Sequence, residues 1–162
     1  YRLPHRSAAT QAGLTQALAV KESMRLLLCF ALLIMPVAAI ADGFKSQEEA
    51  VALTERAMKL AAEGNIRGGL ELIRPYSVVP TAEFDSMIGQ AELQRPVMDN
   101  RFGKSIGYEF VRKESASPSL ARVTYLQKFD RHATVWTFTL YSGSEGWIIN
   151  SFQFVDAIST AF

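Results

Sequence analysis

Cysteine and histidine are almost absent from this 162-residue chain. The one cysteine, Cys29, lies near the start, so residues 42–162 contain none. That excludes a disulfide framework, thiolate catalysis and cysteine metal sites from this part of the chain. The only histidine after residue 41 is His132, and without a second histidine at ligand spacing or a paired acidic cluster we expect no zinc site. We also find no phosphate loop and no dinucleotide fingerprint, so no cofactor is expected.

An excess of either charge sign is also missing. The chain has 17 Lys+Arg against 16 Asp+Glu. Residues 1–41 hold four of the basic residues and one acidic residue, which leaves 13 basic and 15 acidic residues in 42–162 and a net charge of −2. A mildly acidic chain predicts neither nucleic acid nor an anionic membrane as a partner.

The longest apolar run, Leu26–Ala41, is interrupted by Pro36 and is shorter than the roughly 20 residues of a membrane-spanning helix. It follows a Met-Arg start and ends in Ala-Ile-Ala, the pattern of a secretory signal peptide. We therefore predict a signal peptide at 24–41, cut before Asp42, with no stable membrane span afterwards. Residues 1–23 show no apolar periodicity and are interpreted as an upstream extension that is expected to be unstructured. The lack of cysteine and sequons fits export to a bacterial periplasm or secretion.

Helical spacing dominates the first half of the exported part. Ser46 followed by Glu49 forms a capping box at the start of one helix. A proline inside a helical pattern removes a backbone donor, so Pro96 is expected to end or kink the last helix. The predicted helices cover 46–63, 66–74 and a segment that starts at Pro80, with a short β-prone piece at 76–79 before it.

After Gly103 the apolar period changes from 3.6 residues to 2, which predicts strands. Ile106, Tyr108 and Phe110 alternate with polar neighbours and are expected to face inward together. Short turns between consecutive strands predict an antiparallel meander. The four predicted strands begin near residues 106, 121, 136 and 147. Helices first and strands afterwards predict an α+β domain over 42–162, with N-terminal helices packed on a curved four-stranded antiparallel sheet.

Three short segments carry a resemblance to a known fold family. They are Ala61-Ala62-Glu63-Gly64-Asn65, Arg101-Phe102-Gly103 and Gly146-Trp147-Ile148-Ile149. In this order of elements they resemble the nuclear-transport-factor-2-like (cystatin-like) α+β cone, and small exported proteins of that class without an assigned function. The resemblance implies a curved sheet that wraps a helix and leaves a cone-shaped pocket. Its members include enzymes, ligand binders and assembly modules, so the fold leaves the function open.

An aromatic group lies at strand parity and has two interpretations. It is either hydrophobic core or the lining of a pocket for a small apolar ligand. Asn150 has the same parity as Phe152 and is expected to supply one polar contact to such a ligand, or to bond the backbone. The candidate binding residues are Tyr108, Tyr125, Trp136, Phe138, Asn150 and Phe152.

Acid–base chemistry has only two weak candidates, Asp130 and His132. Histidine titrates near neutral pH, but residues two apart in a turn need not face each other. Enzymes of the resembling family use an Asp or His inside the cone, whereas Glu109 is out of phase with its aromatic neighbours and is expected to point outward. No catalytic residue is therefore assigned.

Trp147, Ile149 and Val155 suggest a second apolar face on the sheet, which a homodimer would cover. The sequence thus favours an exported, non-enzymatic binding or interaction module, with an apolar or aromatic pocket or a sheet-face dimer interface. The alternative is a small acid–base enzyme of the same fold, such as a dehydratase or an isomerase.

Overall fold

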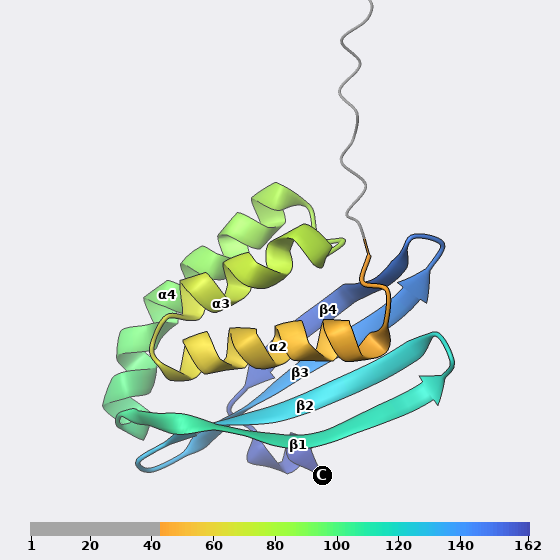
Figure 1. The fold of residues 1–162 in the computed structure, drawn as a ribbon. Coiled ribbons are helices and arrows are strands. Elements are labelled where there is room, and N and C mark those ends of the chain that lie inside the picture. Colours follow the sequence, from red (N-terminus) through yellow and green to blue (C-terminus); the bar gives the residue numbers. More distant parts are fainter. Residues whose placement is uncertain (1–42) are drawn as a thin grey trace, which may run out of the picture. The chain divides into compact units, whose positions relative to one another are not determined.

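A computed structural model describes residues 43–162. The predicted extension at 1–23 and signal peptide at 24–41 lie outside the described residues. The elements are α2 (Gln47–Ala62), α3 (Ile66–Ile73), η1 (Arg74–Tyr76), α4 (Thr81–Phe102), β1 (Ser105–Ser117), β2 (Leu120–Phe129), β3 (Ala133–Gly143), β4 (Gly146–Val155) and η2 (Ile158–Ala161) (Figure 1).

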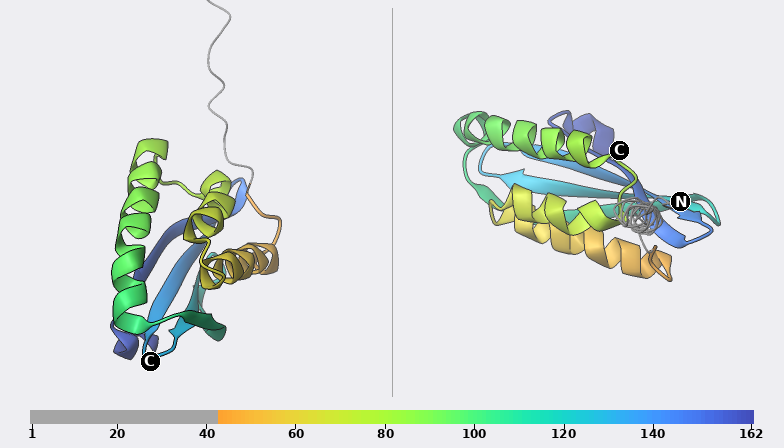
Figure 2. Two further views of the ribbon diagram at one scale, coloured as in Figure 1. Left: turned by 90° about the vertical axis from the view of Figure 1, so that its left-hand side faces the viewer. Right: turned by 90° about the horizontal axis from the view of Figure 1, so that it is seen from above.

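The four strands form one antiparallel sheet in the order β1-β2-β3-β4. It is curved and does not close into a barrel, and α2, α3 and α4 lie over one of its faces (Figures 1 and 2). The short η2 helix lies against the opposite face (Figure 1). This arrangement confirms the predicted α+β class, with helices preceding a four-stranded antiparallel sheet.

Helix α2 begins at the predicted cap. The Ser46 hydroxyl accepts a hydrogen bond from the Glu49 backbone N–H at 3.2 Å, and the Glu49 carboxylate accepts one from the Lys45 N–H at 3.0 Å. The helix ends at Ala62, and Gly64 follows two residues later with a φ of 86°, a left-handed conformation that glycine adopts without steric cost. The buried face of α2 consists of Ala50, Leu53, Thr54, Ala57, Met58 and Ala61.

Helix α4 continues past Pro96 to Phe102, so of the two predicted outcomes, an end or a kink at this proline, the end is wrong. Tertiary contacts hold the last turns instead. Phe102 is buried, with its ring 5.7 Å from that of Phe129. Arg131 donates its backbone N–H to the Phe102 carbonyl at 2.9 Å and its guanidinium to the Asn100 carbonyl at 2.8 Å. These donors satisfy carbonyls that a helix end leaves free, which offsets the hydrogen bond lost at the proline.

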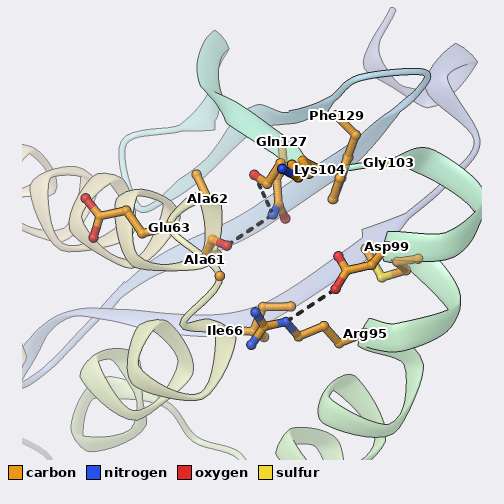
Figure 3. A pocket seen from close by; sticks show the side chains of 13 residues that line it. Ala61, Ala62, Glu63, Ile66, Arg95, Asp99, Gly103, Lys104, Gln127 and Phe129 are labelled. Atoms are coloured by element: carbon orange, nitrogen blue, oxygen red, sulfur yellow. Dashed lines mark hydrogen bonds and ion pairs between the residues drawn. The ribbon is translucent and has the colours of Figure 1, made fainter.

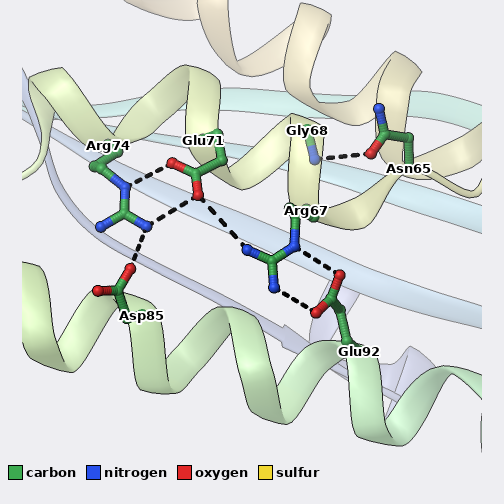
Figure 4. A network of polar contacts seen from close by, with 7 residues as sticks. All are labelled: Asn65, Arg67, Gly68, Glu71, Arg74, Asp85 and Glu92. Atoms are coloured by element: carbon green, nitrogen blue, oxygen red, sulfur yellow. Dashed lines mark hydrogen bonds and ion pairs between the residues drawn. The ribbon is translucent and has the colours of Figure 1, made fainter.

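Charged side chains connect α3 to α4 (Figure 4). Arg67 donates to Glu92 at 2.8 and 2.5 Å, and the Arg74 guanidinium lies between Glu71 and Asp85, 2.6 Å from each. The hydrogen bond from Arg67 lowers the pKa of the Glu92 carboxyl. Because these groups are exposed, each pair stabilises the fold only weakly, and their main effect is to orient the two helices.

A β-bulge in β4 reverses the expected parity of its first half. Thr139 pairs with Ser151 and the next residue of β3, Leu140, pairs with Ile149, so Asn150 is the extra residue. The bulge places Ile149 in the core, where it is fully buried, and leaves Asn150 exposed. Trp147 packs against the same core. Trp147 and Ile149 therefore do not form the expected second apolar face, and Asn150 does not share the buried face of Phe152.

The expected inward face of β1 is only partly formed. Ile106 and Phe110 are exposed by 61% and 52%, which contradicts the expectation that they are buried with Tyr108. Ile106 lies at a register shift between Ser105 and Gly107, and β1 is an edge strand with a neighbour on one side only. Glu109 does point away from the helices: it is exposed and forms an ion pair with Lys128 at 3.3 Å.

Candidate functional site

Most of the candidate aromatic residues form the hydrophobic core. The exposed fractions are 1% for Tyr125, 2% for Trp136, 1% for Phe138 and 8% for Phe152, while Tyr108 is half-buried. Their rings pack against one another at centroid distances of about 6 Å and against α2 and α4. None of these five residues lines the cavity between α2, α4 and the start of β1 that is described below.

Asp130 and His132 have separate partners. The Asp130 carboxylate accepts the Lys104 backbone N–H at 2.9 Å, and its own backbone N–H donates to the Lys104 carbonyl at 3.0 Å. His132 donates through Nε2 to the Asp156 carbonyl at 2.9 Å, and its ring lies 4.4 Å from that of Phe102. The structure does not bring the two side chains together, and both stabilise the connections around the end of α4.

A cavity of about 300 Å³ lies on the helical side of the sheet, where α2 and α4 end and β1 begins (Figure 3). The C-terminal turn of α2 supplies one wall, and Arg95, Met98 and Asp99 of α4 supply another. Gly103, Lys104 and Ser105 connect α4 to β1 along the third side. The volume lies at the lower end of the range for ligand sites and suits a small molecule.

Gln127 of β2 forms the floor of this cavity and is only 2% exposed. Its amide nitrogen donates to the Ala61 carbonyl at 3.1 Å, and its amide oxygen accepts the Trp136 indole N–H at 3.1 Å. The amide nitrogen also lies 3.5 Å from the Ser105 hydroxyl. The buried amide is thus fixed by α2 and β3. Its oxygen retains one lone pair, and the Ser105 hydroxyl can donate to a ligand.

The rim of the cavity carries both charge signs. Arg95 and Lys104 are cationic, whereas Glu63 and Asp99 are anionic. Arg95 and Asp99 are 3.8 Å apart, close to the limit for an ion pair, and no ion pair to Lys104 is formed within residues 43–162. These groups can therefore reorient toward a polar ligand at little energetic cost.

Small residues explain why this space is not filled by side chains. Helix α2 ends in Ala61 and Ala62, and Gly64 follows. A Cβ at Gly64 would lie 2.9 Å from the Arg95 guanidinium, so glycine allows that group to lie against the backbone. At Gly103, where φ is 86°, a Cβ would lie 2.8 Å from that of Asp130. Asp130 thus supports the cavity wall indirectly, by holding the Lys104 backbone.

A buried pair of hydroxyl groups joins α2 to the sheet away from this cavity. Thr54 donates to the Val51 carbonyl at 2.8 Å, and the Tyr125 hydroxyl lies 2.9 Å from the Thr54 oxygen and donates to it. Burial, together with the negative charge of Glu55, raises the pKa of Tyr125 to about 12. Tyr125 is therefore neutral at physiological pH and serves as a structural contact.

Sequence reasoning missed Gln127, Arg95 and Lys104. The sequence does contain a signal for Gln127, because this residue shares the parity of Tyr125 and Phe129 on an otherwise apolar strand face. A polar residue on a buried face must be hydrogen-bonded, and its partners are a natural place to look for a site. Arg95 and Lys104 have no comparable pattern, because only the packing of α4 brings them to the cavity.

Comparison with known proteins yields no relative: no family model, no characterised protein and no solved structure matches the chain. Among residues 43–162, no helix is both long and apolar enough to span a bilayer. The same residues contain no cluster of three or more His, Cys, Asp or Glu side chains arranged for a metal ion.

Proposed function

We propose that this protein is an exported, non-enzymatic binding module of the nuclear-transport-factor-2-like cone type, and that it binds a small polar ligand in the cavity above Gln127. The observation that carries the proposal is that buried amide at the floor of a half-open cavity of about 300 Å³. Helices on one face of a curved antiparallel sheet are compatible with the cone. The signal peptide that the sequence predicts at 24–41 supports export.

The chemistry of the lining favours a small zwitterion. Lys104 and Arg95 suit a carboxylate, Glu63 or Asp99 suits an ammonium group, and Ser105 and Gln127 can bond the polar atoms between them. The predicted apolar ligand has less support, because the aromatic core is filled by its own packing. Homodimer formation stays a prediction, without the apolar sheet face that first suggested it.

Native mass spectrometry of the protein, expressed as the full chain and purified from the exported fraction, tests several parts at once. We expect a chain mass that begins at Asp42, together with a bound polar species released by denaturation. A mass that retains residues 24–41 would contradict export by a cleaved signal. A bound lipid in place of a polar species would contradict the assigned cavity, and the same spectrum reports whether the protein is a monomer or a dimer.

Titration with a panel of free amino acids, followed by amide NMR, tests the ligand class. We expect saturable shifts at the Gln127 side-chain amide and at Ser105. Lys104→Gln should weaken binding about tenfold, as expected for the loss of one charge-assisted hydrogen bond. Lys45→Gln, an exposed change just before the start of α2 and thus at the far end of that helix from the cavity, is the matched control. Equal effects of both variants, or no saturable shift with any amino acid, would refute the proposal.

A further inference from the structure

The sheet face opposite the helices carries two adjacent rows of polar side chains. Cross-strand pairing defines them: residues that pair directly across neighbouring strands lie side by side on one face. One row is Arg112, Thr124, Thr137 and Gln153, and the next is Glu114, Arg122, Thr139 and Ser151. Their inward-facing neighbours, such as Val123, Tyr125 and Phe138, are buried beneath the helices.

The neighbouring row on this outer face is apolar and covered. It consists of Leu126, Val135 and Val155, and the exposed Glu109 of β1 lies at its end. Helix η2 contacts β2 and β3 there, and Val135 is only 1% exposed. Because η2 covers the apolar row and stops beside the polar rows, its Thr160 forms one wall of a cavity of about 350 Å³ whose base is the sheet.

Hydrogen-bond donors dominate this outer cavity. Its lining includes two guanidinium groups, those of Arg112 and Arg122, and the hydroxyls of Thr124, Thr137, Thr139 and Ser151. No carboxylate belongs to the lining. A concave surface with two guanidinium groups, of which only that of Arg112 is paired with a carboxylate among the described residues, and with several hydroxyl donors is complementary to an oxyanion.

The two arginines differ in how firmly they are held. Arg112 donates to the carbonyls of Ala161 and Phe162, and its Nε lies 3.0 Å from a Glu114 oxygen. It is therefore fixed in place before any ligand binds. Arg122 is exposed, and within residues 43–162 it forms no ion pair. Because Arg122 has no ion pair to break in this part of the chain, its guanidinium can turn toward a ligand that Arg112 and the hydroxyls have positioned.

We propose that this outer cavity binds a soluble phosphate-class oxyanion, held between Arg112 and Arg122 and hydrogen-bonded by the threonine hydroxyls. Arg122 supplies a guanidinium fork, and Thr124, Thr137 and Thr139 bind the remaining oxygens. The site lies on the face of the sheet opposite the Gln127 cavity. It does not depend on the function proposed above, and each can fail without the other.

Amide NMR of the full chain, titrated with inorganic phosphate and separately with glycerol phosphate, tests this site. We expect saturable shifts at Thr124, Thr137 and Thr139, which weaken as salt is raised because the contact is largely electrostatic. Arg122→Gln should weaken binding about tenfold, which corresponds to the loss of one charge-assisted contact. Arg56→Gln, an exposed change on α2 on the other side of the sheet, should leave binding unchanged.

Tighter binding of glycerol phosphate than of inorganic phosphate would identify an organic phosphate as the ligand class. Equal binding of the two would identify the free anion. Sedimentation with vesicles of phosphatidylcholine and phosphatidic acid, without a response to either soluble phosphate, would overturn the proposal in favour of a lipid surface. The absence of saturable shifts, or equal weakening by Arg122→Gln and Arg56→Gln, would also overturn it.

Discussion

Replacing Gln127 with leucine is the perturbation that most directly tests how the cavity floor is held. Leucine has a similar volume, so the change removes the hydrogen bonds to Ala61 and Trp136, and the longer one to Ser105, without opening a large void. The Trp136 indole N–H then loses its only partner among the described residues, at a site that is 2% exposed. The Ala61 carbonyl is less affected, because it also accepts the Gly64 N–H at 3.0 Å.

The expected magnitude follows from that asymmetry. Leaving a buried donor unsatisfied costs about 1 to 3 kcal/mol, and losing a bond to an acceptor that keeps another partner costs about 1 kcal/mol or less. We therefore expect Gln127→Leu to lower the free energy of unfolding by about 1 to 4 kcal/mol. Chemical denaturation followed by tryptophan fluorescence measures this value, provided that the slope with denaturant stays unchanged.

A double-mutant cycle isolates the bond between Gln127 and Trp136. Trp136→Phe removes the indole N–H, so adding Gln127→Leu to that variant leaves no orphaned donor. We expect the two changes together to cost about 1 to 2 kcal/mol less than the sum of the single changes. A strictly additive cycle, or a cost for Gln127→Leu below about 0.5 kcal/mol, would refute the reasoning, since surface substitutions have effects of that size.

Three further predictions concern the core, the buried tyrosine and one turn. Phe138→Ala should lower the free energy of unfolding by about 3 to 5 kcal/mol, because Phe138 is buried, whereas Asn150→Ala in the exposed bulge should lower it by less than about 0.5 kcal/mol. Chemical denaturation measures both values, and similar values for the two variants would contradict these placements. The pKa of Tyr125 is raised to about 12 in the folded state and is about 10 when unfolded, so its contribution to the free energy of unfolding should be fully present below pH 10 and should be lost as the pH rises to about 12. Tyr125→Phe should reduce this loss, and a pH profile that the substitution leaves unchanged would contradict the assignment. Gly103→Ala should lower the thermal midpoint of unfolding, because the left-handed φ and the contact with Asp130 both disfavour a Cβ, and an unchanged midpoint would show that the turn relaxes freely.

The order and type of the elements could be predicted from the sequence because they depend on local patterns. Ser46 and Glu49 mark the start of α2, and the change of period after Gly103 marks the start of the sheet. The third helix was predicted to stop or bend at Pro96, because local chemistry alone does not include Arg131 and Phe129, which stabilise the following turns.

The candidate site was predictable only in part. The buried aromatic side chains were recognised as a group, but parity could not reveal the bulge at Asn150, since one extra residue reverses every side chain that precedes it. The cavity above Gln127 depends on where α4 ends relative to β1. No pattern within α4 shows that Arg95 and Lys104 line the same cavity.

Periodicity, caps and turn residues, all local in the chain, determined the α+β class and the antiparallel order of this protein. Only the tertiary structure decided that the aromatic residues form core, that Asp130 and His132 hold separate connections, and that polar groups gather above Gln127 and along the outer sheet face. The physical reason is the distance along the sequence between the residues that interact. Hydrogen bonds and steric limits within a few residues set the elements, whereas a cavity forms between side chains that are distant in sequence, and its chemistry depends on bulges and helix ends that no local pattern records.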